Sequence, residues 1–284
     1  MTATTLDAPE LTREDLLVLD DPTFTPDHVA IVTGAASGIG KALTVALAVN
    51  GLTVVGADID EDGLDATAET VAEFDPDGRF VPAPTDLTDD GDIEAVVDAA
   101  AAEGDLTFVA NVAGLQHIDS IREFSTEQYD LLQSVMLRAP FLVTKYAMDH
   151  LEAGDDVGAI ATMSSVHGHT ATTDKPAYIM AKHGINGLTR AIAAEGTGDV
   201  RGFSVSVGYV LTPLMVDQIA ETAHERGISE EAVIEDVMLG PARTKEMMTP
   251  VEVANLFVFG FSQHARHLNG GDLLFDGGFT TTYE

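Results

Sequence analysis

Residues 28–40 read His28-Val29-Ala30-Ile31-Val32-Thr33-Gly34-Ala35-Ala36-Ser37-Gly38-Ile39-Gly40, a short apolar run followed by a glycine-rich turn. The apolar part is typical of a buried strand, and a helical pattern follows from Lys41 to Asn50. Strand, turn and helix in this order form the first unit of a nucleotide-binding fold. The glycines let the backbone approach a pyrophosphate, whose charge the helix N-terminus stabilises. An ordinary tight turn is the simpler alternative, but three glycines in seven residues favour binding, with contacts from Gly34, Ser37, Gly38, Ile39 and Gly40.

A second apolar run, residues 52–57, ends at Asp58, which lies 18 residues beyond Gly40. An acidic residue about 20 residues after the turn binds the ribose hydroxyls of a dinucleotide. Its charge repels the 2′-phosphate of NADP, and no Lys or Arg follows it, so we predict NAD as the cofactor. An aspartate at the surface end of a strand is the alternative.

Apolar runs alternate with helical patterns along the rest of the chain. This alternation predicts an α/β fold of the Rossmann type, a doubly wound parallel sheet with helices on both faces, in a single domain. We divide the chain into an acidic N-terminal extension (1–27) and a catalytic domain (28–284), with a lid at about 213–249. The predicted strands are residues 28–33, 52–57, 80–84, 106–110, 157–163, 203–207 and 273–275. The predicted helices are residues 41–50, 93–103, 126–151 (interrupted near Ala139-Pro140), 176–195 and 251–261, with helical segments in the lid.

The composition excludes several classes of function. Asp and Glu number 47 against 14 Lys and Arg, a formal net charge of −33, which repels nucleic acid and anionic membranes. No apolar run approaches 18 residues, the N-terminus lacks a signal-peptide pattern, and cysteine is absent. We therefore predict a cytoplasmic protein with no thiolate metal site, and no metal in its active site. Because the acidic residues are spread along the chain, we infer a halophilic source with molar salt in the cytoplasm.

Tyr178 and Lys182 lie four residues apart within the predicted helix 176–195, so both fall on one face. A phenol has a pKa of about 10, and a neighbouring ammonium favours the phenolate. The pair can therefore transfer protons near neutral pH. Such pairs also occur by chance on solvated helices, so the pair needs support from other residues.

Four ordered motifs resemble those of the short-chain dehydrogenase/reductase family. Thr33-Gly34-x-x-x-Gly38-Ile39-Gly40 is similar to its TGxxxGxG turn, and Asn111-Val112-Ala113-Gly114 to its NNAG. Ser165 precedes Tyr178 by 13 residues, as in its Ser–Tyr–Lys constellation. The resemblance implies that Tyr178 takes the substrate's proton, that Lys182 lowers the tyrosine pKa and binds the nicotinamide ribose, and that Ser165 orients the reacting oxygen. Further cofactor contacts are expected from Asp86, Leu87, Asn111, Ala113, Gly114, Tyr178, Lys182, Gly208, Val210 and Thr212.

The resemblance is strongest to one branch, the NAD-dependent D-3-hydroxybutyrate dehydrogenases. The matching stretches include residues 113–117, 165–168, 175–178, 208–214 and 276–279. By resemblance the substrate carboxylate is held by Gln116, His167, Lys175 and Gln218, with Ser165, Tyr178 and Tyr209 completing the substrate site. The chemistry agrees, because a small 3-hydroxy acid offers a carboxylate for charge-assisted bonds. The expected activity is reversible oxidation of (R)-3-hydroxybutyrate to acetoacetate by a homotetramer.

Three residues depart from the family pattern. Met136 stands where the family has an asparagine that holds a relay water, and a thioether cannot replace that amide. We expect another polar group or a water chain to take its place. Val207 replaces a proline before Gly208, and Val112 replaces the second asparagine of NNAG.

Two alternative functions remain open. One is NAD-dependent oxidation of a different small alcohol, sugar or 3-hydroxy acid, and Lys175 is the residue that separates it from the first. The other is a cofactor-binding regulator with weak catalysis, which the methionine at position 136 suggests.

Overall fold

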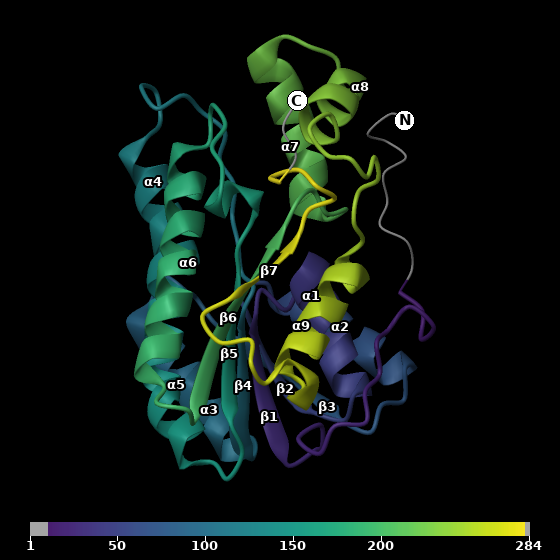
Figure 1. Cartoon of the computed structure of the whole chain (residues 1–284), viewed down its shortest axis with the longest axis vertical. Helices are drawn as coiled ribbons and strands as arrows, with labels where there is room; N and C mark the ends of the chain where they lie inside the picture. Colours follow the sequence, from purple (N-terminus) through teal and green to yellow (C-terminus); the bar gives the residue numbers. More distant parts are fainter. Residues whose placement is uncertain (1–10, 282–284) are drawn as a thin grey trace.

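The computed structural model describes residues 11–281, which fold around one seven-stranded parallel sheet (Figure 1). The strand order is β3-β2-β1-β4-β5-β6-β7, so the direction in which strands are added reverses between β1 and β4. In such sheets ligands bind outside the carboxyl ends of the strands at the point of reversal. The strands are β1 (His28–Thr33), β2 (Thr53–Asp58), β3 (Arg79–Pro84), β4 (Asp105–Asn111), β5 (Gly158–Met163), β6 (Val200–Val207) and β7 (Asp272–Phe275).

Helices cover both faces of this sheet, which confirms the predicted fold class. Alternate residues of a strand point to opposite faces. Accordingly Ala30 and Val32 belong to the apolar cluster shared with α1, α2 and α9, whereas Val29 and Ile31 belong to the cluster shared with α3, α5 and α6. These helices are α1 (Gly38–Val49), α2 (Glu61–Glu73), α3 (Asp90–Glu103), α5 (Ala139–Ala153), α6 (Pro176–Glu195) and α9 (Pro250–Phe261).

The long helical segment after β4 is divided, as the interruption near Ala139-Pro140 predicts. It consists of α4 (Thr126–Gln133), a five-residue π-helix (Ser134–Arg138) and α5. Pro140 lies in the first turn of α5 and has no N–H to donate to the preceding turn, which is the π-helix. The π-helix carries Met136, whose side chain is buried.

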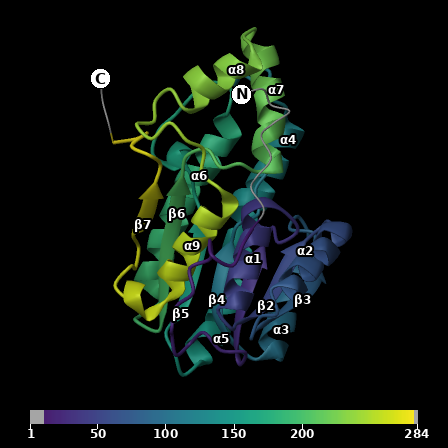
Figure 2. The same ribbon diagram turned by 90° about the vertical axis from the view of Figure 1, so that its right-hand side faces the viewer.

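The predicted lid stands beyond the carboxyl ends of the strands (Figure 2). It contains α7 (Pro213–Arg226), α8 (Glu230–Ala232) and a π-helix (Val233–Met238). Met215, Ile219, Val233, Ile234 and Met238 form a small apolar cluster of their own, separate from the two clusters of the sheet. Residues 213–238 therefore bury part of their apolar side chains against one another.

One helix is absent from the sequence-based expectation, and several elements begin up to three residues away from their predicted bounds. Helix α2 was not predicted, because it is polar on most of its surface and buries only Leu64, Thr67 and Val71. Its start is marked by Asp60, whose carboxylate accepts a hydrogen bond from Gly63 N. Strand β6 begins at Val200, three residues earlier than predicted, and is buried along its whole length.

The part of the N-terminal extension that the structure describes, residues 11–27, lies against α1 and α9. Asn255 Oδ1 accepts from Leu17 N at 2.8 Å, and Asn50 Oδ1 accepts from Leu19 N at 2.9 Å. Leu16 is buried. Residues 1–10 of the predicted extension lie outside the described residues. Between residues 11 and 281, no helix is long and apolar enough to cross a membrane.

Candidate active site

A cavity of 440 Å³ opens at the carboxyl ends of the strands and is closed on one side by α7. Every predicted site residue lines it except Asn111, which is buried in β4 between Thr33 of β1 and Thr162 of β5. Asn111 therefore does not line this cavity, and its contact with a cofactor stays a prediction. Sequence reasoning missed the lining residues Ile59, Thr85, Thr88, Leu115, Leu131, Val135, Met163, Ser164, Val166, Pro213, Leu214 and Met215.

The glycine-rich turn shapes the nucleotide end of the cavity. Gly34 and Gly38 have positive φ angles of 74° and 52°. A Cβ atom on Gly40 would lie 1.9 Å from the carbonyl oxygen of Gly34, so only glycine fits there. Ser37 caps α1 by position without a side-chain hydrogen bond to the helix, which leaves the first amides available to a phosphate. These features fit a dinucleotide.

Asp58 lies at the rim of the same end. Its carboxylate accepts hydrogen bonds from Ala36 N at 3.0 Å and from Asp60 N at 3.1 Å, which fixes its orientation beside the turn. The neighbouring Asp86 is held ionised, because hydrogen bonds from Thr88 lower the pKa of its carboxyl. Two carboxylates thus line this part of the cavity.

Ser165, Tyr178 and Lys182 come together at the centre of the cavity. Ser165 follows β5, and the two other residues lie one turn apart on α6. Tyr178 is within hydrogen-bonding range of Ser165. Lys182 Nζ donates to Met163 O at 2.8 Å and lies 5.4 Å from the centre of the Tyr178 ring. The spacing of these residues in the sequence thus corresponds to proximity in space.

The protonation of the pair differs from the sequence-based expectation. Burial raises the pKa of Tyr178 to about 12, although the hydrogen bond with Ser165 opposes this shift. Burial also lowers the pKa of Lys182 to about 8. The predicted lowering of the tyrosine pKa by Lys182 is thus not observed: desolvation of the phenolate raises this pKa, and Ser165 is the group that opposes the shift. At neutral pH Tyr178 is a phenol and Lys182 is still mainly an ammonium.

Three of the four predicted carboxylate-binding residues have contacts next to this centre. Lys175 Nζ donates to Gln218 Oε1 at 3.0 Å, and the His167 ring lies 5.8 Å from the Tyr178 ring. Burial, reinforced by Lys175, lowers the pKa of His167 to about 3, so its imidazole is neutral. Burial lowers the pKa of Lys175 to about 8. Gln116 lines the cavity, but its Oε1 accepts from His117 N at 3.1 Å.

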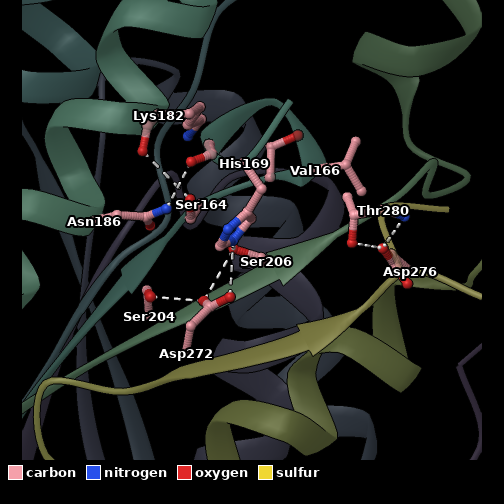
Figure 3. Close-up of polar contacts among 12 residues, drawn as sticks. Ser164, Val166, His169, Lys182, Asn186, Ser204, Ser206, Asp272, Asp276 and Thr280 are labelled. Atoms are coloured by element: carbon pink, nitrogen blue, oxygen red, sulfur yellow. Dashed lines mark hydrogen bonds and ion pairs between the residues drawn. The ribbon is translucent and has the colours of Figure 1, made fainter. Parts of the chain in front are cut away.

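A polar network joins the turn after β5 to α6, β6 and β7 (Figure 3). His169 Nε2 lies 3.0 Å from both Asp272 Oδ2 and Ser206 Oγ, which joins this turn to β6 and β7. Asn186 Nδ2 donates to Gly168 O at 3.0 Å and joins the turn to α6. His169 is therefore structural. Asn186 was missed, because an amide on a helix gives no sign in the sequence of the turn that it binds.

The three departures lie close to the cavity. Met136 is 1% exposed, and its Sδ would be 3.9 Å from a Cβ atom on Gly114. Val207 and Val112 are buried lining residues of the cavity. Val112 N donates to Thr33 Oγ1 at 3.0 Å, so the backbone at this position is held without the asparagine side chain.

Known proteins resemble the chain over most of its length. A family model described as Enoyl-(Acyl carrier protein) reductase matches residues 34–280. D-beta-hydroxybutyrate dehydrogenase of Rhizobium meliloti (strain 1021) is 35% identical, over 88% of this chain and 98% of that protein. D-threitol dehydrogenase of Mycolicibacterium smegmatis is 32% identical, over 95% of this chain and 99% of that protein.

Solved structures share the fold. A candidate NAD(P) dependent gluconate 5-dehydrogenase from Beutenbergia cavernae, with NADP bound at low occupancy, has a TM-score of 0.79 and 27% identity, over 92% of this chain and 100% of that one. A short-chain type dehydrogenase/reductase from Mycobacterium marinum has a TM-score of 0.80 and 25% identity, over 92% of this chain and 98% of that one. Together with the glycine turn and the Ser–Tyr–Lys centre, these likenesses show that the chain belongs to the short-chain dehydrogenase/reductase family of oxidoreductases.

Proposed function

We propose that the protein catalyses the reversible oxidation of (R)-3-hydroxybutyrate to acetoacetate with NAD. The observation that carries the proposal is the buried Lys175, hydrogen-bonded to Gln218 in the same cavity as Ser165, Tyr178 and Lys182. Burying an ammonium destabilises the fold unless a negative charge or hydrogen bonds compensate it, and an amide oxygen compensates only part of the charge. A substrate carboxylate at this position supplies the missing negative charge.

Each residue of the centre has a separate task. Lys175, Gln218 and the neutral His167 hold the carboxylate, which places the C3 hydroxyl near Ser165 and Tyr178. Ser165 donates a hydrogen bond to the reacting oxygen, and Tyr178 takes its proton during oxidation or returns it during reduction. The nicotinamide ring, when bound, accepts the hydride. Because the pKa of Tyr178 is about 12, the phenol is ready to donate at neutral pH, and oxidation is favoured at alkaline pH.

The preference for NAD over NADP rests on Asp58. Its position at the end of β2 and its bond to Ala36 N put a negative charge beside the glycine-rich turn. Because residues 59–61 contain no basic side chain, nothing there would neutralise a 2′-phosphate. We expect kcat/KM with NAD to exceed that with NADP by at least about tenfold, the effect of one unfavourable charge contact.

The test is a cofactor-coupled assay of both enantiomers of 3-hydroxybutyrate with NAD and with NADP in molar KCl. Reduction of NAD with the R enantiomer alone supports the proposal. Lys175→Ala should raise KM for the acid by about 10²-fold, since it removes a buried charge partner. Absence of activity with either enantiomer, or an unchanged KM in the variant, contradicts the proposed substrate class. NADH binding without turnover of any 3-hydroxy acid would support the regulator that Met136 suggests.

A second candidate is oxidation of a neutral alcohol or sugar. It is supported by the likeness to the D-threitol dehydrogenase. In that case Lys175 would bind a hydroxyl of the substrate, and Lys175→Ala would alter turnover of the polyol. 3-Hydroxybutyrate would be a poor substrate of both the wild-type protein and the variant.

We further propose a cytoplasmic homotetramer adapted to molar salt. The net charge of −33 supports the salt adaptation, because a short Debye length screens self-repulsion. Exposed apolar side chains, Phe141 on α5 and Phe259 on α9, offer faces for association. Unfolding in rising KCl and light scattering test these proposals. A constant unfolding temperature, or a monomer in molar salt, would contradict them.

A further inference from the structure

One face of α7 looks towards the loop that precedes α6. Gln218, Thr222 and Arg226 follow each other at intervals of four residues and therefore share this face. Gln218 accepts the hydrogen bond from Lys175 at 3.0 Å. Two turns further along, Arg226 Nη2 donates to Thr173 Oγ1 at 3.3 Å. Two side-chain hydrogen bonds thus join α7 to residues 173–175.

A second cavity, of 410 Å³, lies between this face of α7 and the loop. Thr222 and Arg226 line it from α7, and residues 170–175 line it from the loop. Lys175, His167 and Tyr209 line both this cavity and the first one. The contact between Arg226 and Thr173 therefore lies next to the residues that we propose to bind the carboxylate, with Lys175 in between.

Arg226 is also the positive charge that acts most strongly on Lys175. Burial makes the largest contribution to the lowered pKa of Lys175, Arg226 lowers it further, and Glu221 of α7 raises it. His167 adds no charge at neutral pH. The other titratable groups around the second cavity or against the lysine are Asp174 beside it, Tyr178 on α6, Tyr209 after β6, Glu225 on α7 and Asp236 in the second π-helix of the lid.

We propose that Arg226 is a positioning residue for substrate recognition, which holds α7 against the loop so that Gln218 and Lys175 meet at the carboxylate. This inference rests on the proposed function. The guanidinium does not touch the substrate. It binds Thr173, which lies two residues before Lys175. Because Gln218 lies eight residues before Arg226 on α7, this contact keeps Gln218 opposite Lys175. Loss of the contact lets the lid move relative to the loop, whereas Ser165, Tyr178 and Lys182 stay in place.

The test compares four single variants in steady-state kinetics with (R)-3-hydroxybutyrate. Arg226→Gln removes both the charge and the contact, Arg226→Lys keeps the charge, and Thr173→Val removes the contact alone. Arg190→Gln is the matched control, because Arg190 is exposed on α6 and lines neither cavity. Arg226→Gln and Thr173→Val should raise KM about 3- to 10-fold, the range for one lost hydrogen bond, with kcat nearly unchanged.

The pH dependence of KM distinguishes positioning from a general loss of structure. In Arg226→Gln the pH above which KM rises should move upward, because a positive neighbour of Lys175 is gone. In Thr173→Val and Arg226→Lys it should stay where it is in the wild type. An unchanged KM in Arg226→Gln, or equal effects in Arg190→Gln, overturns the inference. If instead the wild-type protein does not use the acid, or Lys175→Ala leaves KM unchanged, the proposed function itself fails.

Discussion

The two halves of the sheet contribute different kinds of chemical group to the cavity. Around β1 and β2 the binding groups are backbone amides at the start of α1, exposed by glycines. Around β5 and β6 they are ionisable side chains, and burial shifts the pKa values of His167, Lys175, Tyr178 and Lys182 away from their usual range. In the first half the residues that define the fold are also the proposed binding residues, whereas in the second half the burial of the proposed catalytic groups lowers the stability of the fold.

The largest test of this contrast is Lys182→Met. We expect a loss of kcat of about 10²–10⁴-fold, because the proton-transfer pair is broken. We also expect greater stability at pH 7, by about 1–3 kcal/mol, since a buried ammonium with a pKa of about 8 is replaced by an apolar chain. The lost bond to Met163 O offsets part of this gain.

The pH dependence gives the sign of this stability difference. Below pH 8 both folded and unfolded states hold the lysine proton, and the full cost of burying the charge applies. Between pH 8 and about 10.5 only the unfolded state holds the proton, so wild-type stability rises with pH. Thermal unfolding at pH 7 and pH 10 should therefore show the variant's advantage shrinking. Lys145→Met, on the exposed surface of α5, is the control, and an equal gain there would remove the argument.

Backbone-built features were the ones that the sequence predicted best. The glycine-rich turn, strand β1 and helix α6 lie at or near their predicted residues, because spacing in a strand-turn-helix unit is local. Helix α2 was not predicted because only three of its residues are buried against the rest of the domain. Three buried positions give a weak periodic pattern of apolar residues in the sequence.

The next largest effect is expected from glycine in the first half. Gly40→Ala should abolish cofactor binding and lower stability by several kcal/mol, because the new Cβ would lie 1.9 Å from Gly34 O. Gly187→Ala, inside α6, is the matched control, since nothing lies within 4 Å of its Cβ position. That change should stabilise the protein by about 0.5–1 kcal/mol. Calorimetry with and without NADH measures the stability and the cofactor binding of each variant. If Gly40→Ala keeps the wild-type stability and binding, the turn can move to accommodate the new Cβ atom.

A smaller effect should appear in the pH dependence of substrate binding. The charge of Lys175 is fully present below a pKa of about 8 and is lost as the pH rises through it. KM for the acid should therefore increase above pH 8, by up to about tenfold per pH unit, whereas KM for a neutral alcohol should not. His167 contributes no such change, since its pKa is about 3. A flat KM profile between pH 7 and 10 would contradict a carboxylate bound by Lys175.

Side-chain environments were the part of the site that the sequence could not predict. The motif places Tyr178 and Lys182 on one face of α6, but the degree of burial, and hence the raised tyrosine pKa, depends on the lid and on the turn after β5. Likewise Asn111 follows the family pattern yet lies inside the sheet. Arg226 carries no motif, because its link to Thr173 joins residues 53 positions apart.

The smallest expected effect on turnover concerns Met136, whose sulfur lies close to Gly114 of the cavity. We expect Met136→Asn to change turnover less than about threefold, because we infer that the proton path from Lys182 runs through another polar group or a water chain. The variant should lose about 1–3 kcal/mol of stability, since position 136 is 1% exposed within an apolar cluster and an amide there lacks partners. Met136→Leu controls for the change of shape. A gain of tenfold or more in kcat for the asparagine variant alone would show that the methionine impairs the relay.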